Sequence, residues 1–321
     1  MPGKLNEEHI KKTAKLLGLP SEFIRKDFYV TKAIKTLVNV QDDYFNLIFQ
    51  GGTSLSKGYQ IIRRLSEDAD FRVILKPTAL SLSKEIKRRR LRDFRYALIE
   101  ALSTAGFSIN KEEVKVFYEG RFMSIRALFD DSSSLSYLKP HIAVECFVGE
   151  LLLPPETTEI SSLIKVTLGD ECDHDTFPVN CLALDETAAE KWVALTRRIN
   201  NAQEKSRPSD KHLVRHLYDL YHLNQSNLLA GKYIQIAHAV MQKDKEMFKK
   251  LNQEYTENPT RASKTALELL GNDKQWQNHW DDFLEQMVYE ENKPSFAQAY
   301  EQLQQMSKQI LSNAIDLAGV S

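Results

Sequence analysis

The sequence has little of what would assign it to a secreted or membrane class. Its 321 residues include three cysteines, Cys146, Cys172 and Cys181, which form no even disulfide framework. No run of about 18 apolar residues occurs, so we expect no membrane span. The first residues lack the basic and apolar segments of a signal peptide. We therefore expect a cytoplasmic protein.

An excess of charge of one sign is also absent. The formal net charge is -1, which excludes attraction of nucleic acid by the whole molecule but permits a local basic patch. With 42% hydrophobic and 27% charged residues, the composition is that of a folded globular protein. The length exceeds the usual size of a single core, so two domains are expected.

The order of apolar patterns predicts an α+β fold. A helical lead-in over residues 7–40 precedes a buried strand at 44–49 and a helix at 55–64. The next strand carries Asp68 and Asp70. A long helix at 80–105 and four further strands are predicted, at 114–118, 122–129, 141–148 and 163–168. These strands would form a mixed sheet with flanking helices.

The pattern changes after Asp185, where every apolar stretch has the periodicity of a helix. We therefore expect a sheet domain over residues 1–184 and a helical domain over residues 185–321.

Two aspartates separated by one apolar residue outline a site for a metal and a nucleotide. Side chains alternate along a strand, so Asp68 and Asp70 project from one face while Ala69 turns into the core. Mg²⁺ favours one or two carboxylates together with substrate phosphates. The upstream turn of residues 51–54, Gly-Gly-Thr-Ser, lets the backbone approach a phosphate at the start of a helix.

Glu145 is the candidate for a third acidic group. In the predicted strand at 141–148 it lies on the face opposite the apolar Val144 and Cys146, where a carboxylate needs a cation or a donor. It would then serve as a third metal ligand or a base. The alternative is an edge-strand glutamate that faces water.

The chain resembles the AbiEii/AbiGii-type toxin nucleotidyltransferases, a family that includes MenT-like proteins, within the DNA-polymerase-beta-like superfamily. The resemblance is carried by the segments at 51–58 (Gly-Gly-Thr-Ser-Leu-Ser-Lys-Gly), 64–70 (Arg-Leu-Ser-Glu-Asp-Ala-Asp), 186–195 and 215–220 (Arg-His-Leu-Tyr-Asp-Leu). It implies a polymerase-beta-like sheet followed by a helical domain. It also implies a toxin of a toxin-antitoxin or abortive-infection system, with a cognate antitoxin, that transfers NMP from an NTP to an RNA or protein hydroxyl. Related proteins modify the tRNA acceptor end, so tRNA is the first acceptor to test.

The resemblance also implies roles for individual residues. Mg²⁺ or Mn²⁺ would bind Asp68, Asp70 and Glu145, which with Lys191 and Asp219 would be catalytic. The nucleotide would be bound by Gly51, Gly52, Thr53, Ser54, Lys57, Arg64 and Ser66. Arg215 and Asp219 are four residues apart, so a surface ion pair on one helix is the structural alternative for Asp219.

A basic stretch is the best candidate for contacting RNA phosphates. Residues 84–95 contain seven cations offset only by Glu85 and Asp93, on a predicted helix. The predicted RNA contacts are Lys87, Arg88, Arg89 and Arg92. A solvated basic helix face is the alternative.

Other interpretations remain open at this stage. Cys172, His174 and Cys181 are possible zinc ligands, although their spacing fits no standard zinc finger. A non-catalytic module that binds nucleic acid or a partner would retain the fold without the chemistry. A small-molecule nucleotidyltransferase would need an acidic pocket for a cationic acceptor rather than a basic helix.

Overall fold

A computed structural model describes residues 5–129, 138–205, 207–208, 210–249 and 252–317. The chain divides into two compact units, one of Met1–Gln60 with Leu65–Leu182 and the other of Ile61–Arg64 with Ala183–Ser321. None of the described helices is both long enough and apolar enough to cross a membrane.

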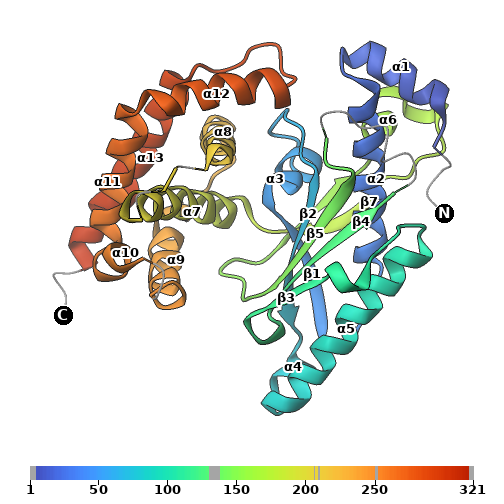
Figure 1. Cartoon of the computed structure of the whole chain (residues 1–321), viewed down its shortest axis with the longest axis horizontal. Coiled ribbons are helices and arrows are strands. Elements are labelled where there is room, and N and C mark those ends of the chain that lie inside the picture. The colour runs from blue at the N-terminus through green and yellow to red at the C-terminus, as the bar shows by residue number, and fades with distance from the viewer. Residues whose placement is uncertain (1–4, 130–137, 206, 209, 250–251, 318–321) are drawn as a thin grey trace. The chain divides into compact units, whose positions relative to one another are not determined.

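The first unit is built on a seven-stranded mixed sheet (Figure 1). Its strands are β1 (Phe45–Gln50), β2 (Asp68–Leu75), β3 (Lys115–Phe117), β4 (Phe122–Leu128), β5 (His141–Val148), β6 (Glu156–Ile160) and β7 (Phe177–Cys181). They are ordered β3-β4-β5-β2-β1-β7-β6. The β2–β5 and β1–β7 pairs are parallel and the others antiparallel. The mixed α+β architecture expected from the sequence is confirmed.

One face of the sheet forms the main core. Helices α2 (Ser21–Val38) and α5 (Lys84–Thr104) lie on the same side of the strands in Figure 1 and contribute apolar side chains to one cluster. Ala69, Phe71 and Val73 of β2 face this cluster. Because side chains alternate along a strand, Asp68 and Asp70 lie on the opposite face. The smaller helices of this unit are α1 (Glu7–Leu17), α3 (Gly51–Thr53), the π-helical turn η1 (Ser54–Gly58), α4 (Pro77–Leu80) and α6 (Leu163–Leu168).

The prediction of a helix at 55–64 is wrong in where the helix begins and where it ends. Helical structure begins at Gly51, directly after β1, and ends at Gly58. Gln60 has a φ of 55°, a left-handed conformation that does not continue a helix. Arg64 then forms an isolated β-bridge with Val288 in the second unit.

The strand predicted at 163–168 is also wrong, because this segment is the helix α6. The Ser162 side chain caps it by accepting from the Lys165 N–H at 3.2 Å, and Asp27 accepts from the Leu163 N–H at 2.7 Å. Strands β6 and β7 were not predicted. The sequence of β6 is mostly polar because it is an edge strand, and β7 contains Pro178.

The second unit is helical in its described residues, apart from the bridge at Arg64. Its helices are α7 (Leu184–Glu204), α8 (Val214–Gln225), α9 (Tyr233–Met247), α10 (Gln253–Glu257), α11 (Pro259–Asn272), α12 (Lys274–Met287) and α13 (Phe296–Leu317). Trp192 of α7 is fully buried and its indole N–H donates to Ser307 of α13 at 2.8 Å. Trp276 and Trp280 of α12 are buried as well.

Candidate active site

Neighbouring strands bring the predicted carboxylates together. In the parallel β2–β5 pair, Asp70 lies opposite Glu145, and Asp68 lies opposite Ala143. Glu145 and both aspartates project from the same face, since alternation places Val144 and Cys146 in the core. The sheet therefore presents three carboxylates from two adjacent strands on one face.

Gly51 makes the close approach of Asp70 to the glycine turn possible. Its φ is +83°, and a Cβ added there would lie 2.4 Å from Asp70 Oδ2. The approach follows from register, because Gln50 at the end of β1 lies opposite Asp70. Only glycine meets both conditions, so the Asp70 carboxylate is packed against the backbone of the turn.

The Thr53 hydroxyl holds the glycine turn to β2, and the Ser54 hydroxyl bonds within the turn. The Thr53 hydroxyl donates to the Asp68 carbonyl oxygen at 2.5 Å and lies 2.6 Å from the Ser66 hydroxyl. The Ser54 hydroxyl donates to the Gly51 carbonyl oxygen at 2.9 Å. Both side chains are buried. Both hydroxyls have partners within the protein, while the backbone N–H groups at the start of a helix have none inside the helix. The predicted contacts of Thr53 and Ser54 with the nucleotide stay predictions.

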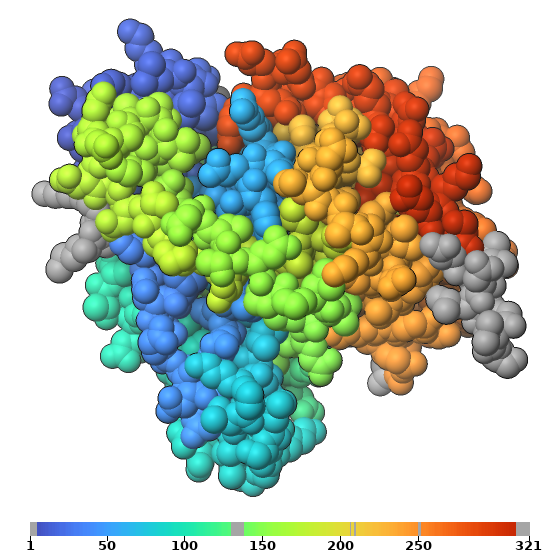
Figure 2. Space-filling model, turned by 180° about the vertical axis from the view of Figure 1, so that it is seen from behind, coloured from blue at the N-terminus to red at the C-terminus, as the bar shows by residue number. Residues whose placement is uncertain are grey.

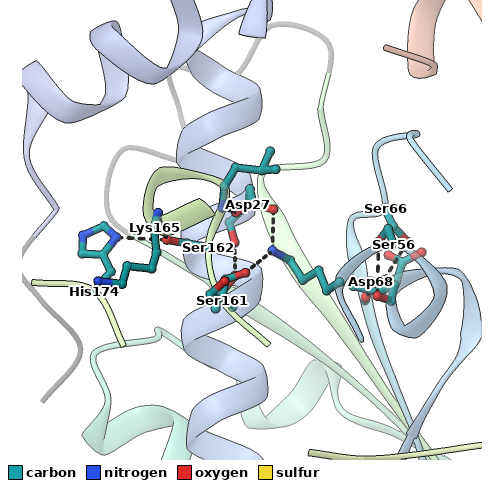
Figure 3. Close-up of polar contacts among 12 residues, drawn as sticks. Asp27, Ser56, Ser66, Asp68, Ser161, Ser162, Lys165 and His174 are labelled. Atoms are coloured by element: carbon teal, nitrogen blue, oxygen red, sulfur yellow. Dashed lines mark hydrogen bonds and ion pairs between the residues drawn. The ribbon is translucent and has the colours of Figure 1, made fainter. Parts of the chain in front are cut away.

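Lys57 points away from the carboxylates, toward α2. Its ammonium group donates to Asp27 Oδ1 at 2.5 Å, with the Ser161 carbonyl oxygen at 3.4 Å. In Figure 3, Ser56, Ser66 and Asp68 lie together on one side, and Asp27 and Ser161 lie on the other. Asp27 therefore neutralises the charge of Lys57. The predicted contact of Lys57 with phosphate stays a prediction.

The sequence analysis missed a cation beside Asp68. Lys139 Nζ donates to Asp68 Oδ1 at 3.1 Å, and the Lys139 N–H donates to Glu67 Oε2 at 2.9 Å. The fully buried Lys26 donates to the carbonyl oxygens of Lys139 and His141, at 2.6 Å each. Burial lowers the pKa of Lys26 to about 8, although Glu67 opposes the shift. In the sequence, the sign of a nearby cation was Glu67, an acidic residue next to Asp68 whose side chain is buried.

The Glu145 side chain is exposed on its face of β5, yet the neighbouring protein still removes part of its solvent. Burial raises its pKa, and the neighbouring Asp68 carboxylate raises it further, while Lys139 and the Ser124 hydroxyl oppose the shift. A carboxyl group in this state can accept a proton near neutral pH more readily than an ordinary glutamate.

Lys191, Asp219 and Arg64 meet in the second unit. The Arg64 guanidinium donates to both Asp219 oxygens, at 2.7 and 2.9 Å, and Lys191 Nζ lies 2.7 Å from Oδ2. Asp219 is fully buried, so it forms no surface pair. Burial alone would raise its pKa, but Arg64 and Lys191 outweigh this and lower it. The catalytic and nucleotide-binding roles predicted for these residues stay predictions.

The comparison with known families identifies the protein class. The family described as "Nucleotidyl transferase AbiEii toxin, Type IV TA system" matches residues 37–302, which is well over half of the chain. The chain belongs to the AbiEii family. It is therefore a nucleotidyltransferase toxin of a type IV toxin-antitoxin system, which implies a nucleotide substrate and a cognate antitoxin. The resemblance seen in the sequence is confirmed.

Two solved structures are similar to this AbiEii chain. MenT4, a nucleotidyltransferase toxin of Mycobacterium tuberculosis H37Rv, is 19% identical over 72% of this chain and 77% of its own, with a TM-score of 0.38. A putative nucleotidyltransferase from H. pylori is 11% identical over 93% of this chain and 99% of its own, with a TM-score of 0.46. Among curated proteins, no sequence matches the chain.

The donors of the AbiEii site fit a divalent cation through two carboxylates. Within the described residues, no three His, Cys, Asp or Glu side chains converge as a metal site, so Glu145 does not complete a cluster with the two aspartates. Asp68 and Asp70 still supply the hard oxygen ligands that Mg²⁺ takes together with substrate phosphates. The gap that Gly51 leaves beside Asp70 Oδ2 keeps that carboxylate next to the turn.

The predicted RNA contacts lie at the other end of the first unit. Helix α3 is at one end of the sheet in Figure 1, and α4 with the start of α5 is at the other. Figure 2 shows this second end in cyan, at the bottom of the view. Lys87 Nζ donates to the Leu80 carbonyl oxygen at 2.9 Å, and Arg92 lies 3.8 Å from Asp93. Arg88 and Arg89 line a groove beside α5.

The candidate zinc ligands do not converge in the described part of the chain. Cys172 and Cys181 are buried, with the Cys181 sulfur 3.2 Å from the Thr158 hydroxyl. His174 Nδ1 lies 3.0 Å from the Ser162 hydroxyl. Each group interacts with its own neighbours, which gives no support to the zinc interpretation.

Replacing Glu145 by glutamine is expected to raise the melting temperature of this AbiEii toxin at pH 8 while lowering transfer activity. The folded state raises the pKa of Glu145, so the charged carboxylate is destabilising above that pKa, and the gain should shrink as the pH falls toward 5. Thermal denaturation at both pH values measures this. Glu159→Gln, on the edge strand β6, is the control and should change little. A lower melting temperature for Glu145→Gln at pH 8 would contradict the inference that the charged Glu145 is destabilised by burial and by Asp68.

Proposed function

We propose that this AbiEii toxin transfers a nucleoside monophosphate from an NTP to an RNA hydroxyl in a reaction that depends on Mg²⁺, and that the tRNA acceptor end is the first acceptor to test. The observation that carries the proposal is the Asp70 carboxylate packed against Gly51, with Asp68 on the same face of β2. This places acidic oxygens beside backbone that can approach a phosphate.

The chemistry requires few groups. The acceptor oxygen attacks the α-phosphorus, the bond to the β-phosphate breaks, and pyrophosphate leaves. Bound Mg²⁺ would neutralise the charge that develops on the phosphates. Asp68 and Asp70 would hold it, and the backbone N–H groups of residues 51–53 would orient the triphosphate. Glu145 would accept the proton of the acceptor hydroxyl, because a raised pKa makes its carboxylate a stronger base than an ordinary glutamate.

Lys139 would position Asp68 in this scheme. Its backbone is held by two buried groups, Glu67 at the N–H and Lys26 at the carbonyl oxygen. Its ammonium group reaches Asp68 from this fixed point. A cation placed in this way also balances the charge of a site with three carboxylates.

The test is transfer of label to RNA. Purified protein is incubated with Mg²⁺, total tRNA and each NTP labelled at the α-phosphate, and we expect label in RNA for at least one NTP. EDTA should abolish transfer. If no NTP labels any RNA and Mg-NTP does not raise the melting temperature, the non-catalytic binding module replaces this proposal.

A further inference from the structure

The edge strand β3 separates two surfaces of the first unit. On the α5 side lies a groove of about 560 Å³, lined by four arginines of α5 together with Val116 and Gly120. The arginines are Arg88, Arg89, Arg92 and Arg95. We call this the arginine groove.

The arginine groove has a fixed wall. Arg95 donates to the Gly120 carbonyl oxygen at 2.9 Å, which ties the turn after β3 to α5. Tyr118 and Glu119 in this turn have φ values of 52° and 56°, unusual for residues other than glycine. Backbone strain of this kind persists only where the surroundings hold it, so this turn is a fixed part of the wall of the groove.

On its other face, β3 begins a row of aromatic side chains. Phe117 is 51% exposed and stacks on Phe122 of β4 with ring centroids 6.0 Å apart. The register continues the row, because Phe122 lies opposite Phe147 of β5. Tyr118, at the end of the strand, is 62% exposed. The exposed Phe117 on the edge strand, backed by the half-buried Phe122 of β4, offers a flat surface on which a nucleobase can stack.

The aromatic row runs beside the carboxylates. The neighbouring row of the same face is Lys115, Ser124, Glu145 and Asp70, as the pairings of β3, β4, β5 and β2 show. From β3 to β2 there are three strand spacings, or about 14 Å. A stacked single strand rises about 3.4 Å per nucleotide, so roughly four nucleotides span this distance.

We propose that a single-stranded nucleic-acid end crosses the edge strand β3 to reach the carboxylates. Its phosphates lie in the arginine groove, the strand passes over the turn at Tyr118, and its terminal bases stack on Phe117 and Phe122. This inference rests on the proposed function, since the terminal hydroxyl is the acceptor. It adds that the acceptor must have an unpaired end of about four nucleotides.

Nucleic acid fits these surfaces better than an acidic protein segment does. Arginine pairs with phosphate, and exposed rings beside the cations stack with bases, a combination typical of single-strand binding. The arginine groove also contains Glu85 and Glu119, which would repel carboxylates packed along it. Phosphates in a strand are spaced, so they can contact the arginines and leave the two glutamates in solvent.

The experiment measures binding without chemistry. Two RNAs with a 5′ fluorescent label, a hairpin with a 3′ overhang of four nucleotides and the same hairpin with a blunt end, are titrated with the full chain without NTP or Mg²⁺. Fluorescence anisotropy at several salt concentrations gives Kd and its salt dependence. We expect the overhang RNA to bind about a hundredfold more tightly than the blunt one, since two bases stack and each adds roughly tenfold in affinity.

Two variants test the two halves of the path. Arg88→Glu with Arg89→Glu should weaken binding of both RNAs more than tenfold and reduce the salt dependence. Phe117→Ala should weaken only the overhang RNA, about tenfold, and Phe117→Trp should restore it. Lys11→Glu with Lys15→Glu on α1 is the matched charge control and should bind as wild type. Melting temperatures verify that each variant is folded.

Three results would overturn this inference: equal binding of the two RNAs, unchanged binding by the arginine variant, or loss of both RNAs in Phe117→Ala. An arginine groove that serves an acidic partner instead would give unchanged RNA binding. The outcome is separate from that of the proposed function, because Asp70→Asn should bind RNA as wild type does. Intact binding without label transfer would count only against the proposed function.

Discussion

Asp219→Ala is expected to lower the free energy of unfolding of the helical unit by about 3–5 kcal/mol, the usual cost of leaving a buried ionic partner unpaired. Asp219 is fully buried and neutralises both Arg64 and Lys191. Alanine would remove the buried carboxylate that neutralises both cations, and little solvent is available to replace it. Arg64 also bridges to Val288, so its displacement should loosen the segment at 61–64.

Thermal or urea denaturation followed by circular dichroism measures this loss, and a fall in melting temperature of roughly 10 °C corresponds to it. Glu246→Gln, which breaks the exposed pair with Lys249, is the control and should have almost no effect. The folded state lowers the pKa of Asp219, so its contribution is present above the unfolded value of about 4 and is lost as the pH falls further. An unchanged melting temperature combined with lost activity would indicate a purely catalytic Asp219.

The sequence predicted the parts of the fold that have strong local patterns. Strand β2 could be predicted because Asp68-Ala69-Asp70-Phe71 alternates cleanly, and its neighbour β5 because Glu145 interrupts an apolar strand. The mixed sheet and the helices after Asp185 followed from the same periodicity. Each of these elements has one buried and one exposed face, so its apolar residues recur with the period of a strand or a helix and can be recognised in the sequence.

The elements that were missed depend on tertiary contacts. The segment 163–168 is apolar enough for a strand, but the Ser162 cap and the Asp27 acceptor make it helical. Strand β6 has four polar residues of five and, among the described strands, pairs with β7 alone, so its sequence shows no apolar alternation. Short segments of this kind take their structure from neighbours that a local pattern does not contain.

The candidate site shows the same division. The positions of Asp68, Asp70 and Glu145 follow from alternation along strands, so their shared face could be predicted. The partners of Lys57 and Asp68 could not, because Asp27 and Lys139 are distant in sequence from them. The family resemblance implied that Thr53 and Ser54 bind the nucleotide, which stays a prediction, but it gave no sign that the Thr53 hydroxyl bonds to β2 or that the Ser54 hydroxyl bonds to Gly51.

Gly51→Ala is expected to reduce nucleotidyl transfer by about a hundredfold, although it removes no functional group. A Cβ at Gly51 would lie 2.4 Å from Asp70 Oδ2, so the carboxylate must move away from the turn. The proposed role of Asp70 is to hold Mg²⁺, and displacing a group that positions the reactants by about an ångström can cost roughly a hundredfold in rate. Transfer of α-labelled NTP to RNA under saturating Mg²⁺ measures the effect.

Gly18→Ala is the matched control for Gly51→Ala. Gly18 has a φ of +63° at the end of α1, but a Cβ there would meet nothing within 4 Å. Both substitutions therefore strain a left-handed backbone, at a cost of about 1 kcal/mol, and only the one at Gly51 displaces a carboxylate. Gly18→Ala should lose stability and keep its activity. Full activity in Gly51→Ala would show that Asp70 is not held against the turn during the reaction, and the metal ligands would have to be sought elsewhere on the sheet.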